Sequence, residues 1–232
     1  MNSKATGMTL TLGIIVGFIG YILWQITLGI DTKSDDITTI LTNSGDGSAM
    51  IQISSILICV GLITYVAGLI STKGTTDSSF ESIGIVFFVA AVVMWIANIG
   101  AGLALAEMGE KFVAAMAGAA AGNAEAAATA GTIGTAGGYI QAVNVASSTM
   151  GGLLAGIGFL SLGLAYRGTD IKGAISFLPV GLLAIVIGLV LIVSAIIISP
   201  LVSIEAASQV SGIAFILILI WSVSRGMAIS RS

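Results

Sequence analysis

The feature that most constrains this chain is an uncharged stretch near its carboxyl end. The residues AISFLPVGLLAIVIGLVLIVSAIIIS occupy positions 174–199 and include no Asp, Glu, Lys or Arg. About 20 apolar residues in a helix are enough to cross the hydrocarbon core of a bilayer. The stretch therefore predicts a transmembrane helix, and five further segments have the same character. The six predicted helices are 8–30, 50–70, 83–106, 139–166, 174–199 and 207–224.

Composition excludes the alternative of a soluble helical protein. The chain is 56% hydrophobic and only 8% charged, whereas a soluble domain is roughly 25% charged. A soluble fold of this length does not have enough interior to hide so much apolar surface. We therefore predict an all-α integral membrane bundle of about six transmembrane helices, forming one transmembrane domain over residues 1–232.

The basic residues predict the orientation of the bundle. Between the predicted helices they fall mostly on one set of sides, whereas Lys33 and Lys111 fall on the other. The larger set is Lys4, Lys73, Arg167, Lys172, Arg225 and Arg231. Because Lys and Arg accumulate in cytoplasmic loops, we expect both termini in the cytoplasm, and we expect the membrane to be the plasma membrane.

The two long connections lie on the predicted outer side. Residues 31–49 are acidic and rich in Thr and Ser, and residues 107–138 form an outer loop rich in Ala and Gly. The first part of this second loop, 107–122, is able to extend the third helix because Ala is the best helix former. We expect its second part, 129–138, to be a flexible turn.

Glycines recur at spacings that suit helix packing. They are Gly13, Gly17 and Gly20 in the first predicted helix, Gly152 and Gly156 in the fourth, and Gly181 and Gly188 in the fifth. Glycine lets two helix backbones approach closely. Packing inside one six-helix bundle is the favoured interpretation, and a dedicated oligomer interface is the alternative.

Polar side chains in or near the predicted helices are the clearest functional signal. The carboxamides all fall in the outer half of the membrane or at its outer edge: Gln25, Gln52, Asn98, Gln141, Asn144 and Gln209. The candidate substrate-binding residues are Asn98, Glu107, Gln141 and Asn144, which would line a polar cavity open to the outside. In the favoured alternative, the helices protrude beyond the lipid and these groups lie in water or among head groups.

The aromatic residues at the predicted helix ends suit the membrane interfaces. Trp24 and Tyr139 fall at the outer boundary, and Tyr166 and Trp221 fall near the inner one. Trp and Tyr are enriched at both interfaces, so we predict aromatic belts and no cofactor-binding role for these residues.

Catalytic and metal chemistry have little support in the sequence. There is no histidine, and Cys59 is the single cysteine, which excludes Ser-His catalysis and the usual zinc and copper sites. We therefore expect no metal, no cofactor and no enzymatic activity. A net charge of -3 also gives no reason to expect a nucleic-acid partner.

Two functional classes remain. The first is a non-catalytic accessory or structural subunit of a membrane complex, whose partners are the lipid bilayer and either other membrane subunits or further copies of itself. The second is a small-solute transporter or channel that uses the outer polar residues. Because the inner half of the predicted bundle has few polar groups, we favour the first class.

Overall fold

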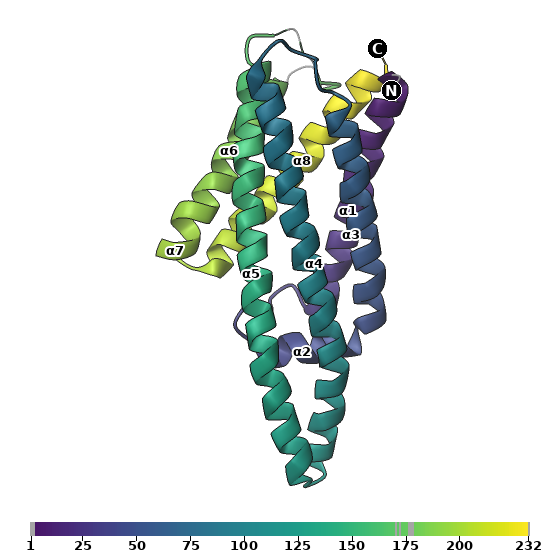
Figure 1. Cartoon of the computed structure of the whole chain (residues 1–232), viewed down its shortest axis with the longest axis vertical. Helices are drawn as coiled ribbons and strands as arrows, with labels where there is room; N and C mark the ends of the chain where they lie inside the picture. Colours follow the sequence, from purple (N-terminus) through teal and green to yellow (C-terminus); the bar gives the residue numbers. More distant parts are fainter. Residues whose placement is uncertain (1–2, 170, 172, 176–178, 232) are drawn as a thin grey trace. The chain divides into compact units, whose positions relative to one another are not determined.

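The computed structural model describes residues 3–169, 171, 173–175 and 179–231, and over these residues it contains helices and no strands. The prediction of an all-α membrane bundle is confirmed. The helices are α1 (Ser3–Leu28), α2 (Ile37–Asp46), α3 (Ser48–Ile70), α4 (Ser79–Ala120), α5 (Ala124–Tyr166), α6 (Val180–Val193), a π-helical turn η1 (Ser194–Ile198), α7 (Ser199–Leu201) and α8 (Ile204–Ser230) (Figure 1).

Six helical stretches of the described chain are long and apolar enough to cross a membrane. They are α1, α3, α4, α5, the continuous stretch Val180–Leu201 and α8. An α-helix pairs its own backbone N–H and C=O groups, which is the requirement for a chain segment surrounded by lipid. Residues 176–178 of the fifth predicted helix lie outside the described residues, as does Lys172, which entered the orientation argument.

The expected outer loop 107–138 is instead a helical hairpin. α4 continues to Ala120 and α5 begins at Ala124 (Figure 1), so the prediction of a flexible turn over 129–138 was wrong. The turn lies at Gly122, whose φ of 87° is readily adopted by glycine. The side chain of Asn123 then accepts hydrogen bonds from the backbone N–H groups of Glu125 (2.9 Å) and Ala126 (3.1 Å). These bonds cap the start of α5. The Ala-rich residues on both sides of the turn favour the helical conformation.

The π-helical turn η1 ends two residues before Pro200. Pro200 has no N–H to donate to the turn that precedes it, and a local change from α to π geometry accommodates such a break. Ser194, at the start of η1, is 2% exposed and donates a hydrogen bond to the backbone carbonyl oxygen of Ala207 at 2.8 Å. This bond ties the end of α6 to the start of α8.

The chain divides into two compact units. Unit 1 comprises Met1–Phe18, Cys59–Met94 and Thr149–Ser232, and unit 2 comprises Ile19–Ile58 and Trp95–Ser148. Helices α1, α3, α4 and α5 each contribute residues to both units, whereas α2 belongs to unit 2 and α6 to α8 belong to unit 1.

Unit 1 is built around a column of aromatic rings. Neighbouring ring centroids are 5.3 Å apart in edge-to-face geometry along the series Tyr65, Phe88, Phe159 and Trp221. Tyr166 stacks on Trp221 with centroids 6.4 Å apart. Tyr166 and Trp221 are 3% and 1% exposed, so the prediction that they form an interfacial belt was wrong. They pack against each other, and Trp221 also packs against Phe159 of α5. The sequence pattern does not reveal these contacts.

Glycines let the helices of unit 1 come together. Gly61 of α3 lies against the backbone of Gly17 in α1, and a Cβ added to Gly61 would clash with it. On α6, Gly181 and Gly188 approach the α5 backbone near Gly163 and Gly156 respectively. These contacts support packing within the chain as the role of the glycine spacings. Gly152 differs, because an added Cβ there would have nothing within 4 Å.

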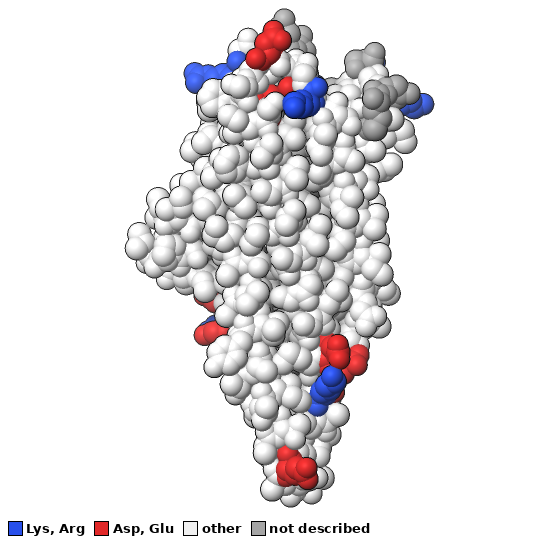
Figure 2. Space-filling view, in the orientation of Figure 1, with Lys and Arg blue, Asp and Glu red and all other residues white. Residues whose placement is uncertain are grey.

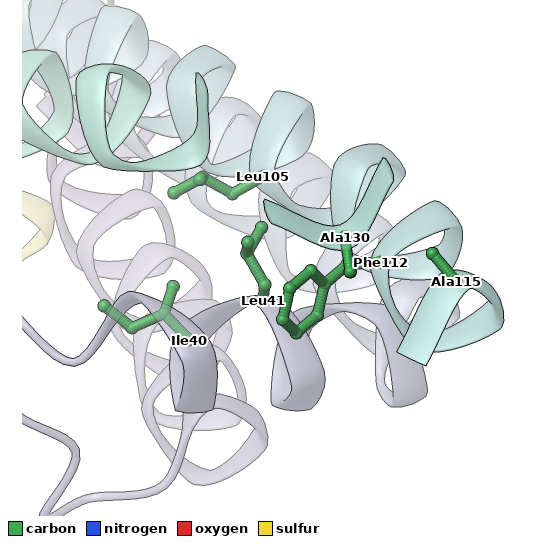
Figure 3. Packing of buried hydrophobic residues seen from close by; sticks show 6 residues of the cluster. All are labelled: Ile40, Leu41, Leu105, Phe112, Ala115 and Ala130. Atoms are coloured by element: carbon green, nitrogen blue, oxygen red, sulfur yellow. The ribbon is translucent and has the colours of Figure 1, made fainter. Parts of the chain in front are cut away.

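Unit 2 has a small hydrophobic core of its own. Helix α2 packs against the α4–α5 hairpin through a cluster of six buried residues, all shown in Figure 3: Ile40, Leu41, Leu105, Phe112, Ala115 and Ala130. The side chain of Leu41, which is 0% exposed, meets that of Phe112 between α2 and the hairpin (Figure 3). The close approach of Gly45 in α2 to Gly109 in α4 makes this packing possible.

Candidate functional site

The predicted residues Asn98 and Asn144 lie together in unit 2. The side-chain Nδ2 of Asn98, on α4, donates a hydrogen bond to the backbone oxygen of Asn144 on α5 at 2.9 Å. The same nitrogen also contacts Oδ1 of Asn144. Both residues are half-buried. Because a buried amide is costly unless it is partnered, this pairing gives the two amides a role in joining α4 to α5.

Gln141 joins a different pair of segments. Its side-chain Nε2 donates to the backbone carbonyl oxygen of Ser34 at 3.1 Å. The bond holds the segment between α1 and α2 against α5. The side-chain Nδ2 of Asn43, on α2, makes a similar bond to the carbonyl oxygen of Leu28 at 2.7 Å. These two amides organise the connection that leads into α2.

Glu107 is not brought to the asparagine pair. It follows Asn98 on the same continuous helix at a distance of roughly 13 Å along the axis, at 1.5 Å per residue. Its carboxylate pairs with Nζ of Lys111 at 2.9 Å, and the two side chains are 72% and 66% exposed. Solvent screens a surface pair of this kind. Glu107 therefore lies on the surface and does not form the floor of a cavity with Asn98.

The segment between α1 and α2 carries a shallow hollow. Gly29, Asp31 and Asp36 are among its lining residues, and none of the four predicted site residues lines it. Asp36 caps α2 through hydrogen bonds from the hydroxyl (2.7 Å) and the backbone N–H (3.1 Å) of Thr39. These bonds lower the pKa of the Asp36 carboxyl below its ordinary value.

Unit 1 contains a buried polar cluster that the sequence analysis did not identify. Glu81, at the first turn of α4, is 1% exposed. Its Oε2 accepts a hydrogen bond from the backbone N–H of Gly74 at 2.7 Å, and its Oε1 accepts one from the Tyr166 hydroxyl at 3.4 Å. The carboxylate thus ties the α3–α4 connection and the end of α5 to the start of α4.

Arg225 is the cation of this cluster. It is 7% exposed, and its Cζ lies 5.7 Å from the centroid of the Tyr166 ring. Its Nε is buried without a hydrogen-bond partner in the described part of the chain. Tyr166 thus contacts both Arg225 and Glu81.

Neutral hydrogen bonds surround these charges. Ser222 donates to the hydroxyl oxygen of Tyr65 at 2.8 Å, and the indole Nε1 of Trp221 donates to the backbone oxygen of Val180 at 3.0 Å. Each bond joins α8 to another helix. Unit 1 therefore holds its polar groups in pairs that cross between helices.

The sequence contained one indirect signal for this cluster. Glu81 stands two residues before the apolar run that starts at 83, and Arg225 directly follows the run that ends at 224. A charge at such a position is usually solvated at the membrane surface, so the local sequence of neither residue predicts burial. Only their contacts with residues distant in the sequence show that they are buried.

The described residues do not bring together any cluster of three or more Asp, Glu, Cys or His side chains that could hold a metal ion. Apart from Nε of Arg225, the polar groups described above pair with one another or with the backbone. Such an arrangement joins helices and orients segments.

Comparisons with protein-family models, with curated proteins and with solved structures found no match to this chain. The functional argument therefore depends on the fold and on the contacts described above. The six apolar helices make this chain a multi-pass membrane protein.

Proposed function

We propose that this protein is a non-catalytic accessory or structural subunit of a membrane complex. The observation that carries the proposal is the pairing of the outer polar residues. Asn98 bonds Asn144, Gln141 bonds the backbone of Ser34, and Glu107 pairs with Lys111 at the surface. Amides engaged in this way support helix association and leave few polar groups to bind a solute.

The length of α4 and α5 supports an extramembrane contact role. The two helices contain 42 and 43 residues, so each is roughly 63 Å long at 1.5 Å per residue. A hydrocarbon core is only about 30 Å thick. About half of the hairpin must therefore lie beyond the hydrocarbon core.

The surface of the hairpin is unusually poor in charge. Residues 99–138 include four charged side chains, which are Glu107, Glu110, Lys111 and Glu125. Figure 2 shows few charged groups on an otherwise uncharged surface. A surface that faces water normally carries about 25–35% charged residues. This low proportion of charged residues suits a surface that another protein covers in the assembled complex.

The exposed side of α5 has the composition of a helix-packing surface. Beyond Glu125 in the first turn, exposed residues recur along this helix at helical spacing and are uncharged: Ala128, Thr132, Thr135, Tyr139 and Ala142. The glycine contacts of α1, α3, α5 and α6 are used within the chain, so they are not the surface proposed for a partner. The hairpin is the surface that we assign to this role.

The remaining parts of the proposal come from the sequence. The distribution of Lys and Arg supports cytoplasmic termini, and we propose the plasma membrane as the location. The absence of histidine from the chain and its single cysteine support a protein that is not an enzyme. The transporter or channel hypothesis requires a connected polar path, and the pairing of Asn98 with Asn144 weighs against one.

Crosslinking from the hairpin in its native membrane tests the proposal. A photo-crosslinking amino acid is placed at Thr132, on the exposed side of α5, and at Ile56, which is 64% exposed on α3, as the matched control. We expect Thr132 to yield one stoichiometric protein adduct and Ile56 to yield lipid adducts. If intact particles extracted gently contain this chain alone and Thr132 yields no protein adduct, the accessory role is wrong.

A further inference from the structure

The turn that joins α7 to α8 has an apolar surface, although it ends a helical hairpin (Figure 1). Leu201 is 77% exposed, Val202 is 70% exposed and Ile204 is 41% exposed. The sequence contains no charged residue from 174 to 204. A turn that faces water is normally built of polar residues, and a cluster of exposed apolar side chains usually marks a contact surface. The composition of this turn therefore requires an explanation.

The connection between α1 and α2 shows the ordinary arrangement. Ile30 is 77% exposed, the same fraction as Leu201. It is followed directly by Asp31, and Lys33 comes two residues later; both charged side chains are exposed. Two aliphatic side chains of equal exposure thus have charged neighbours in one connection and apolar neighbours in the other.

The backbone of the α7–α8 turn satisfies several of its own donors. The N–H groups of Val202 and Ser203 both donate to the carbonyl oxygen of Ile198, at 2.9 and 3.2 Å. The hydroxyl oxygen of Ser203 accepts a hydrogen bond from the N–H of Ala206 at 3.0 Å, and Pro200 has no N–H to satisfy. Within a hydrocarbon core there is no water to pair with backbone groups, so the chain itself must supply their partners. At these positions the turn meets that requirement.

The helical stretch that leads to the turn is no longer than a hydrocarbon core requires. Val180–Leu201 contains 22 residues and is roughly 33 Å long at 1.5 Å per residue. The core is about 30 Å thick. A tilt of about 20°, the average for membrane helices, shortens the stretch to roughly 31 Å along the membrane normal. Almost no length is left to carry the turn into water.

We propose that residues 201–204 stay within the edge of the hydrocarbon core, where lipid acyl chains cover the side chain of Leu201. The preceding turn of helix also exposes apolar side chains, namely Ile196 at 56% and Ile197 at 48%, so the lipid-facing surface of the membrane span continues without a break into the turn. Glu205, the first charged residue after it, is half-buried in the first turn of α8. The dipole of a helix favours a carboxylate at that position.

Collision measurements on the spin-labelled full-length protein in lipid vesicles test this inference. In a Cys59→Ala background, a nitroxide is attached to Leu201→Cys and, as the matched control, to Ile30→Cys. Ile56→Cys, at a position 64% exposed within α3, is the lipid-facing reference. Oxygen concentrates in hydrocarbon, whereas a nickel chelate stays in water. We expect the labels at 201 and 56 to collide with oxygen several-fold more often than with the chelate, and the label at 30 to show the reverse.

The length of the lipid acyl chains provides a second measurement. Shorter acyl chains make the core thinner and bring position 201 nearer to water, so its collisions with the chelate should increase several-fold. Collisions at position 30 should not change. Val202→Cys is an independent site on the same turn if Leu201→Cys loses its helical circular dichroism.

Two results would overturn the proposal. Chelate collisions at positions 201 and 202 as frequent as those at position 30 would place the turn in water. Exclusion of both oxygen and the chelate, independent of acyl-chain length, would show that protein covers the turn, for example a second copy of this chain. Neither result depends on the accessory role proposed above, because the vesicles contain this chain alone.

Discussion

The side-chain amide of Asn98 donates to the backbone oxygen of Asn144 at 2.9 Å, joining α4 to α5 within unit 2. Both residues were predicted from sequence as members of an outer polar group. Their pairing changes what they are expected to do, because the amide that was a candidate solute ligand now has a partner in the protein.

The first prediction concerns the reactivity of this position. Asn98→Cys should react slowly with a membrane-impermeant maleimide added from outside, because the side chain lies at a helix–helix contact. Tyr139→Cys, at a position 73% exposed, should react quickly and is the control. The measurement is the labelling rate in intact cells. Equal rates for the two variants would support a polar cavity that is open to the outside.

The second prediction concerns the energy of the same pair. A double-mutant cycle with Asn98→Ala and Asn144→Ala should give a coupling of about 0.6 kcal/mol, the average for hydrogen bonds between membrane helices. Reversible unfolding in mixed micelles provides the measurement. Because Asn98 also bonds the backbone of Asn144, Asn144→Ala alone should cost less than Asn98→Ala. The reverse order would contradict the assignment of the backbone bond.

The third prediction concerns the core of unit 2. Leu41→Ala removes a side chain that is 0% exposed and should destabilise the packing of α2 on the hairpin by about 2–5 kcal/mol. Hydrogen exchange of the α2 amides and proteolysis of the hairpin report the loss. Met116→Ala, at a hairpin position 45% exposed, should change neither readout. If Leu41→Ala leaves α2 equally protected, α2 is not held by this core.

The fourth prediction concerns the cap of α2 and its dependence on pH. Thr39 donates two hydrogen bonds to Asp36, which hold the pKa of Asp36 below its ordinary value. A carboxyl whose pKa is lower in the folded state stabilises that state above its unfolded pKa. Its contribution is lost as the pH falls through the folded pKa.

Amide exchange at Thr39 measures this effect. Protection of the Thr39 N–H should fall in the wild-type protein as the pH is lowered below about 3.9, the ordinary pKa of an aspartate. It should be low at every pH in Asp36→Ala. Asp36→Asn, which keeps an oxygen acceptor, should retain protection that does not change with pH. Protection of Asp36→Ala equal to that of the wild type would show that the cap has no role in stability.

The fifth prediction compares a glycine at a helix–helix contact with a glycine that has open space around it. Gly61→Ala should lower the melting temperature, because its Cβ would meet the backbone of Gly17. Gly212→Ala is the matched control, since an added Cβ there has nothing within 4 Å. This control should be neutral or stabilising by up to about 1 kcal/mol, as Ala favours the helix over Gly. Similar losses in the two variants would contradict the assigned contact between α1 and α3.

The hairpin shows why part of the fold escaped prediction. Residues 129–138 contain four glycines, in the sequence TAGTIGTAGG, and local propensity predicts a flexible turn there. In the structure they are helical, and Gly137 and Gly134 face Leu41 and Phe112. Packing against residues elsewhere in the chain stabilises this helix, whereas Gly122 and Asn123 supply the actual turn.

The sequence by itself determined that the solvent of this protein is largely lipid and that its membrane-spanning segments are helices. Runs of apolar residues longer than a bilayer requires, with 8% charged residues overall, leave the membrane helix as the structure that pairs its own backbone groups. Tertiary structure alone decided which polar groups are buried and with which partners. Glu81 and Arg225 have the local sequence of surface charges, but both are buried and both contact Tyr166. Contacts between residues so far apart in the chain leave no local pattern, so periodicity and composition do not reveal them.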